Sequence, residues 1–153
     1  MLLDANRATA LRLLRDSNLL PSVLPELATL PPAEFDETTR VLAALDKPSL
    51  PLAFAGLLVR LPTPNSPLPA PSSPLPASIG RRLRYTNKEI DRAAWLLANR
   101  PAIATAADLP WPRLQRLLTH DGADELLALH EAIADSGDTA LGFCRERLVW
   151  PAE

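Results

Sequence analysis

The chain has a single cysteine, Cys144, and only two histidines among its 153 residues. One cysteine cannot form an internal disulfide, so the sequence predicts a protein of a reducing compartment, the cytoplasm. With so few soft ligands, none of the usual zinc sites is expected, and we predict no metal site in this chain. The five glycines are scattered singly, which excludes a glycine-rich loop that cradles phosphates. No nucleophile elbow is present either, so we expect no catalytic centre here.

Aromatic residues are also scarce, at 5% of the chain, whereas 47% of all residues are hydrophobic. The core must therefore consist mainly of leucine and alanine, which favour helix over strand. No apolar run is long enough to cross a bilayer. Charged residues such as Asp4, Arg7 and Arg12 interrupt the N-terminal region, so no signal peptide is predicted. We expect a protein that makes no contact with membranes.

Hydrophobic periodicity and turn residues predict an all-α fold of about eight or nine short antiparallel helices in three parts. Residues 1–61 form an N-terminal helical part, and residues 78–153 form a C-terminal helical part. Between them, residues 62–77 hold seven prolines, which favour extended backbone and predict a linker or long loop. Two Pro-x-x-Pro spacings within it would suit a partner domain, although the segment has no arginine or lysine to orient such docking.

In the N-terminal part, the first helix is expected to begin after Asp4 or Asn6 and to end at Asn18 in a left-handed turn. Its expected buried stripe is Ala10, Leu11, Leu13 and Leu14. One short helical turn follows at 23–27. The next helix opens at Pro31–Pro32 and ends at Lys47–Pro48, with an inward face of Phe35, Thr38, Val41, Leu42 and Leu45. Residues 51–59 are apolar all round, which predicts a helix buried on every side.

In the C-terminal part, Asp108 is expected to cap a helix that begins near Pro110. Asp121–Gly122 predicts a turn, and 123–135 predicts a helix with its leucines inward. A last helix contains Cys144, which we interpret as a small core residue. His120–Asp121 has the form of a metal-binding pair, but such sites need further histidines and a distal aspartate. We therefore interpret His120 as a residue that bonds the end of its helix.

Residues 81–97 hold the densest positive charge of the chain. Residues 81–92 carry five arginines or lysines against two acids, a local charge of +3 in a chain of net charge −2. One helix should end near Arg84, and a second should run from a Thr86/Glu89 capping box to about Asn99, before Pro101. The candidate phosphate-binding residues are Arg81, Arg82, Arg84, Lys88 and Arg92. The alternative is that these side chains are solvated or only complement a helix dipole.

Two stretches resemble the C-terminal helical neck and body of bacterial tRNA nucleotidyltransferases (CCA-adding enzymes) and related poly(A) polymerases. The first is ALRLLRDSNLL at 10–20, followed by VLPEL at 23–27. The second is RLRYTNKE at 82–89, which is similar to the Arg-Leu-Arg-Leu-Ser-Asn-Lys-Glu signature of that family. The resemblance covers most of residues 1–135. Many relatives carry a His-Asp pair where this chain has Val59–Arg60, so that metal site is absent.

This resemblance implies a role in holding tRNA, or another RNA 3′ end, for nucleotide addition by a head domain that is absent from this chain. The Mg²⁺ ions and nucleoside triphosphates of the reaction would belong to that head domain, which is the other expected partner. Because the chain lacks the head, we expect a fragment, a gene with a misassigned start or a decayed paralogue. The alternative hypothesis is a decayed, non-catalytic helical module that acts in protein interaction or structure. The choice between CCA and poly(A) addition stays open.

Overall fold

The computed structural model describes residues 1–61, 74–134 and 139–148, and these ranges are all-α, as the sequence predicts. They contain ten α-helices and one 3₁₀ helix, η1, and no strand. The count exceeds the expected eight or nine because the single turn expected at 23–27 is two separate turns, α2 and α3. The helices are α1 (Arg7–Asp16), α2 (Leu20–Val23), α3 (Pro25–Ala28), α4 (Pro32–Ala44), α5 (Leu50–Leu58), α6 (Pro74–Arg82), α7 (Asn87–Ala104), η1 (Ala106–Asp108), α8 (Trp111–Leu118), α9 (Ala123–Ile133) and α10 (Thr139–Leu148).

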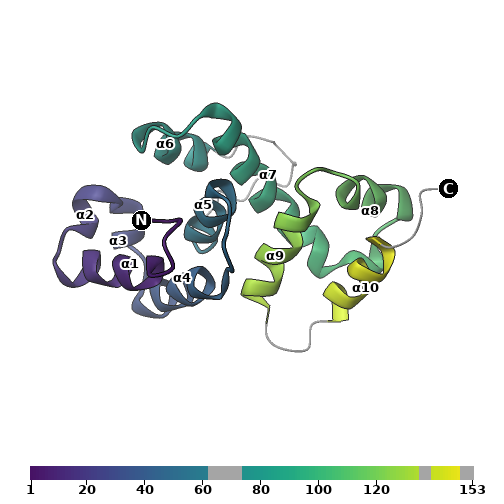
Figure 1. The fold of residues 1–153 in the computed structure, drawn as a ribbon, viewed down its shortest axis with the longest axis horizontal. Coiled ribbons are helices and arrows are strands. Elements are labelled where there is room, and N and C mark those ends of the chain that lie inside the picture. Colours follow the sequence, from purple (N-terminus) through teal and green to yellow (C-terminus); the bar gives the residue numbers. More distant parts are fainter. Residues whose placement is uncertain (62–73, 135–138, 149–153) are drawn as a thin grey trace.

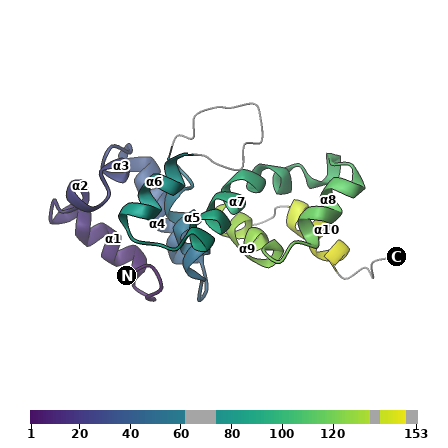
Figure 2. The same ribbon diagram turned by 90° about the horizontal axis from the view of Figure 1, so that it is seen from above.

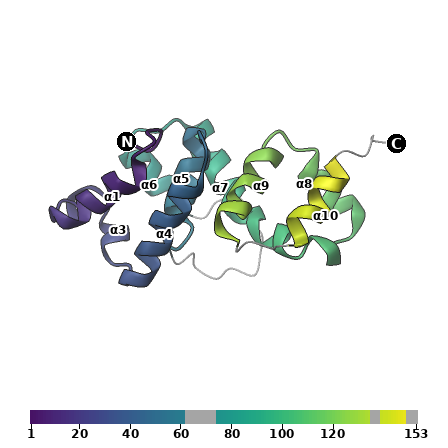
Figure 3. The same ribbon diagram turned by 60° about the horizontal axis from the view of Figure 1, so that its bottom comes forward.

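The helices form an elongated assembly, with α1 to α4 towards one end and α8 and α10 towards the other (Figures 1 and 2). The 18-residue α7 runs between the two ends and contacts α5, α6, α9 and α10. On the side shown in Figure 3, α4, α5 and α9 pack against one another. A single hydrophobic core therefore extends through both of the helical parts expected from the sequence.

Helix α5 is the centre of this core, and the prediction that it is buried on every side is confirmed. Every residue from Leu52 to Leu58 is buried, because α4, α7 and α9 all pack around the helix. Phe54 is fully buried and meets the ring of Tyr85 edge-on, with ring centroids 5.0 Å apart. Burial of this kind is the main driving force for joining the two halves of the chain.

The end of α1 is as predicted, and so is part of its buried face, because Leu11 is fully buried and Leu14 packs against the core. Asn18 has a φ of 57°, the expected left-handed conformation. Leu13, expected inside, is 61% exposed, whereas Arg7 is only 4% exposed. The Arg7 guanidinium explains this difference, because it donates hydrogen bonds to the carbonyl oxygens of Leu42 and Leu45 at the end of α4 and of Asp4. Helix α1 is thus turned so that its first residue supplies partners for carbonyls that α4 leaves unpaired.

The predicted linker at 62–77 is too long, because α6 begins at Pro74 and residues 74–77 are helical. Proline is tolerated in a first helical turn, where the backbone N–H groups have no partner within the helix. Both Pro74 and Pro76 lie in that turn, so they cost α6 no hydrogen bond. Residues 62–73 lie outside the described residues; they hold the spacing Pro64/Pro67 and the first proline of the spacing Pro71/Pro74.

Two further boundaries differ from the prediction. Helix α7 does not stop before Pro101 but continues to Ala104. A proline inside a helix removes one hydrogen bond and crowds the preceding turn, but burial of Ile103 at 0% exposure offsets part of that cost. Asp108 does not cap α8: it lies in η1, and the residue at the N-cap of α8 is Pro110.

In α10, Cys144 is fully buried, which confirms it as a core residue.

Within the described ranges, no helix combines the length and the apolar character needed to span a bilayer.

Candidate functional site

The five basic residues between Arg81 and Arg92 surround the tight turn that joins α6 to α7. The N–H of Tyr85 donates to Gly80 O at 2.9 Å, and the N–H of Arg84 donates to Arg81 O at 3.1 Å. This pair of bonds is a Schellman motif, which closes a helix and requires a left-handed residue next to its end. Arg84 is that residue, with a φ of 61°. Glycine usually occupies such a position, because a side chain there is strained.

Helix α7 starts with the capping box that the sequence predicts. The Glu89 N–H donates to Thr86 Oγ1 at 3.3 Å, and the Thr86 N–H donates to Glu89 Oε2 at 2.7 Å. The latter bond, together with one from the Thr86 hydroxyl, lowers the pKa of Glu89. These bonds fix the first turn of α7 and therefore hold Lys88 next to the turn that carries Arg84.

Arg82, one of the five candidates, is held by a carboxylate from a distant part of the chain. Its Nη1 and Nη2 atoms donate to Glu26 Oε1 at 2.8 Å and Oε2 at 2.7 Å. The hydrogen bonds from Arg82 lower the pKa of Glu26. This two-pronged geometry fixes α6 onto α3, so Arg82 serves the fold and has little capacity left for a phosphate.

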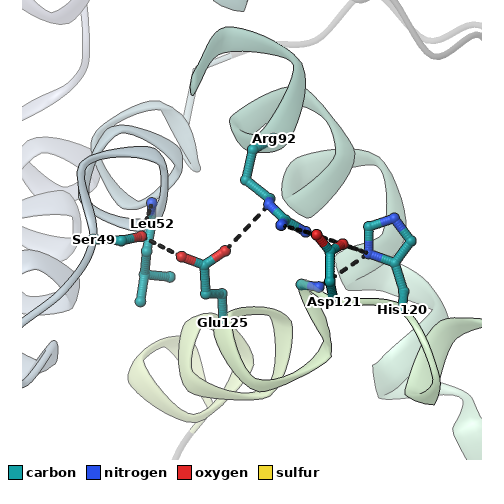
Figure 4. A network of polar contacts seen from close by, with 7 residues as sticks. Ser49, Leu52, Arg92, His120, Asp121 and Glu125 are labelled. Carbon is teal, nitrogen blue, oxygen red and sulfur yellow. Dashed lines mark hydrogen bonds and ion pairs between the residues drawn. The ribbon is translucent and has the colours of Figure 1, made fainter. Parts of the chain in front are cut away.

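Arg92 is likewise occupied, in the network that Figure 4 shows. Its Nη1 and Nη2 atoms donate to Asp121 Oδ1 at 2.7 Å and Oδ2 at 2.6 Å, and its Nε atom lies 3.5 Å from Glu125 Oε2. Glu125 also accepts a hydrogen bond from Ser49, the cap of α5. The hydrogen bonds from Arg92 lower the pKa of Asp121. The network joins α5, α7 and α9, which is a structural role.

His120 belongs to the same network rather than to a metal site. Its Nδ1 accepts from the Gly122 N–H at 3.0 Å, and its ring stacks on Trp95 with centroids 3.9 Å apart. His120 was expected to bond the carbonyls that end α8, but it instead accepts from the N–H that precedes α9. Across residues 1–61, 74–134 and 139–148, no three His, Cys, Asp or Glu side chains are placed to hold a metal ion.

Three candidates remain: Arg81, Arg84 and Lys88. All three are exposed, and within the described part of the chain no carboxylate or hydrogen-bond acceptor engages their charged groups. The turn thus presents two guanidinium groups and one ammonium group to solvent on a rigid Schellman and capping-box scaffold. Such groups can contact phosphates without first breaking an ion pair.

Next to this basic turn lies an open hollow of about 560 Å³ at the N-terminal ends of α7 and α9. Lys88 and Arg92 line it together with four carboxylates, from Glu89, Asp121, Asp124 and Glu125. Acids outnumber bases in the hollow, so it does not favour an anionic ligand. The exposed turn that carries Arg81, Arg84 and Lys88 is therefore a better place for a phosphate contact than the interior of the hollow.

The ion-pair partners of Arg82 and Arg92 could not be found from the sequence. Glu26 and Asp121 stand 56 and 29 residues away from them, and no local spacing connects such distant charges.

No family model matches this chain, and neither the curated proteins nor the solved structures include a match.

Proposed function

We propose that this chain is a helical RNA-binding module of the tRNA nucleotidyltransferase or poly(A) polymerase type. In this role it holds a tRNA acceptor end, or another RNA 3′ end, while a separate head domain adds nucleotides. The chemistry, with its Mg²⁺ ions and nucleoside triphosphates, takes place in that head domain, and this module supplies contacts only. The cytoplasm is the compartment consistent with such a role.

The observation that carries the proposal is the conformation of Arg84. A side chain in the left-handed region costs stability that glycine would avoid. Strain of this kind is often found where function requires the side chain. Arg84 lies beside Arg81 and Lys88 at the turn that bears the family-like signature, and all three side chains face solvent without an ion pair to a described residue. In an RNA complex, the charged groups of Arg81, Arg84 and Lys88 would contact phosphates of the backbone.

The proposal is tested by the affinity of the full chain for an RNA hairpin that mimics a tRNA acceptor stem with its 3′ end. The test variant is Arg81→Gln with Arg84→Gln. The matched control is Arg113→Gln with Arg116→Gln, which removes the same charge from exposed positions of α8. We expect affinity to fall at least tenfold in the test variant and to change less than twofold in the control. Equal losses would indicate a non-specific charge effect and would refute the site.

The second candidate function is protein interaction, and one observation favours it. Leu3, Leu13 and Leu19 are 58%, 61% and 53% exposed, all within the first 19 residues of the chain. Where exposed leucines form one contiguous apolar patch, that patch is a candidate surface for binding a partner. If this is the function, substitution of the leucines by glutamine abolishes partner binding, and the arginine variants leave it intact.

A further inference from the structure

The ring of His120 lies in the α8–α9 turn (residues 119–122) and meets three groups at one nitrogen atom. Its Nδ1 lies 3.0 Å from the backbone N of Gly122 and 3.0 Å from Asp121 Oδ1. Arg92 Nη1 lies 3.4 Å from the same nitrogen (Figure 4). The backbone N–H and the guanidinium can only donate a hydrogen bond, whereas an ionised carboxylate can only accept one. The protonation state of Nδ1 therefore decides which of these groups it binds.

When Nδ1 carries no proton, it accepts from the Gly122 N–H, and the ring proton is on Nε2. Gly122 is the N-cap of α9, so this bond fixes the residue at which that helix starts. The two oxygens of Asp121 then serve the guanidinium of Arg92, at 2.7 and 2.6 Å. The one unfavourable contact of this state is between the lone pair of Nδ1 and the Asp121 carboxylate.

When Nδ1 carries a proton, each of these contacts changes sign. Nδ1–H can donate to Asp121 Oδ1, which already accepts from Arg92 Nη1. The imidazolium also places a positive charge 3.4 Å from that guanidinium nitrogen, and like charges repel. The Gly122 N–H loses its acceptor. Because Gly122 is buried, its N–H can bond to water instead only if the turn moves.

The other charged groups nearby do not compensate the protonated ring. Glu125 of α9 lies on the other side of the Arg92 side chain from His120, with its Oε2 3.5 Å from Nε (Figure 4). The remaining charged groups of the neighbouring helices are Lys88 and Glu89 of α7, Asp124 of α9 and Arg116 of α8. Within residues 1–61, 74–134 and 139–148, none of these side chains forms an ion pair or a hydrogen bond with the imidazole.

The α8–α9 turn packs so closely on α7 that a small shift cannot absorb this change. A Cβ at Gly122 would lie 2.3 Å from Arg92 Nη1 and 3.0 Å from Trp95 Cζ3, so the backbone of the turn is directly against α7. The ring of His120 stacks on Trp95 with centroids 3.9 Å apart, which holds Nδ1 in its place. Protonation therefore acts on the contact between α7 and the start of α9.

We infer that His120 is a pH-sensitive switch at the contact between α7 and the α8–α9 turn. Its side chain is 38% exposed, so protons reach it from solvent. Histidine is the side chain that changes charge between about pH 5 and 8. With the ring neutral, Nδ1 holds the Gly122 N–H and the turn is closed on α7. With the ring protonated, Nδ1–H competes with Arg92 for Asp121 and the turn opens. This inference requires no RNA and is independent of the proposed function.

The test is an NMR titration of the full chain from about pH 8 to about pH 5. The ¹⁵N shifts of the imidazole identify its tautomer, and we expect the Nε2–H form at the upper end. The Gly122 amide resonance should then move with the same midpoint as the His120 ring. The hydrogen-exchange protection factors of the Gly122 and Ala123 amides, which are corrected for intrinsic exchange, should fall at least about tenfold. Ala123 reports on the turn because its N–H donates to His120 O at 3.0 Å.

The matched control is His120→Asn. The side-chain oxygen of asparagine can accept from the Gly122 N–H in place of Nδ1, and the amide does not titrate. Both amides should therefore keep their protection at both ends of the pH range. Unchanged protection in the unaltered chain overturns the inference, as does an equal loss in His120→Asn. An Nδ1–H tautomer at about pH 8 also contradicts it. The tautomer and the protection are measured in the unaltered chain, so the test does not require the variant to fold.

Discussion

Arg82 and Glu26 form a two-pronged ion pair across 56 residues of sequence, with N–O distances of 2.8 and 2.7 Å. The pair joins α6 to α3 and removes Arg82 from the set of cations that could meet RNA. Its neighbours Arg81 and Arg84 remain in solvent. In this short stretch, Arg82 therefore stabilises the fold, whereas Arg81 and Arg84 belong to the proposed contact surface.

Arg84→Gly should stabilise the fold and weaken RNA binding in the same protein. Glycine accepts the left-handed conformation without strain, so we expect the free energy of unfolding to rise by about 1 kcal/mol. The hairpin affinity should fall, because one guanidinium is lost. Urea unfolding and fluorescence anisotropy measure the two effects. Asn18→Gly is the control, with a smaller gain because asparagine already tolerates this conformation. A destabilised Arg84→Gly would mean that the side chain supports the fold.

Gly122→Ala should destabilise the chain by about 1–3 kcal/mol through overpacking. A Cβ at this position would lie 2.3 Å from Arg92 Nη1 and 3.0 Å from Trp95 Cζ3. Arg92 cannot move away without breaking its bonds to Asp121. Chemical unfolding of the variant measures the loss.

Gly142→Ala provides the opposite case for comparison. Among the described residues, no atom outside the neighbouring backbone of α10 lies within 4 Å of the added methyl group. Alanine should raise the free energy of unfolding by about 0.5–1 kcal/mol through its better helix propensity. Equal effects of the two glycine substitutions would show that the contact with Arg92 is not rigid.

Arg7→Lys should lower the free energy of unfolding by about 2 kcal/mol, although it preserves the charge. An ammonium group cannot reach the carbonyl oxygens of Leu42, Leu45 and Asp4 together, as the guanidinium does. Arg12→Lys, at an exposed position on the same helix, should change stability by less than about 0.5 kcal/mol. Similar losses in both variants would contradict the capping role of Arg7.

Glu37 should contribute stability that disappears in acid. Its hydrogen bonds from Arg40, followed by those from Arg60, lower its pKa from 4.5 to about 2. Because the pKa is lower in the folded chain, the contribution is complete above about pH 5 and is lost as the pH falls towards 2. Glu37→Gln should therefore cost about 1 kcal/mol or less at pH 7, and this cost should shrink as the pH falls through 2. Urea unfolding of both proteins across this range measures the difference, and a constant difference would refute the assignment.

Features that depend on neighbouring residues could be predicted from the sequence. The capping box of Thr86 and Glu89, the left-handed Asn18 and the buried α5 each follow from local spacing or composition. The misjudged start of α6 and end of α7 both involve proline, and the N-cap of α8 is Pro110 rather than the expected Asp108. Pro74 starts a helix at a place that allows proline, and packing around Ile103 carries α7 past Pro101.

Features that depend on distant residues could not be predicted. The sequence shows five basic residues from Arg81 to Arg92 as one group, and only the structure separates those that meet Glu26 or Asp121 from those in solvent. Burial of Arg7 is a similar case, because two of its three acceptors, the carbonyl oxygens of Leu42 and Leu45, lie more than 30 residues away at the end of α4. In each case the partner is set by how helices pack, and helix packing leaves no short-range pattern in the sequence.

The most direct test of the central claim is the salt dependence of binding between the full chain and the acceptor-stem hairpin. Each phosphate contact made by a cation adds to the slope of log affinity against log salt concentration. We expect the triple variant Arg81→Gln, Arg84→Gln and Lys88→Gln to bind more weakly and to reduce this slope by about 2–3. If the triple variant keeps both the affinity and the slope of the unaltered chain, the basic turn does not bind RNA and the proposed function is wrong.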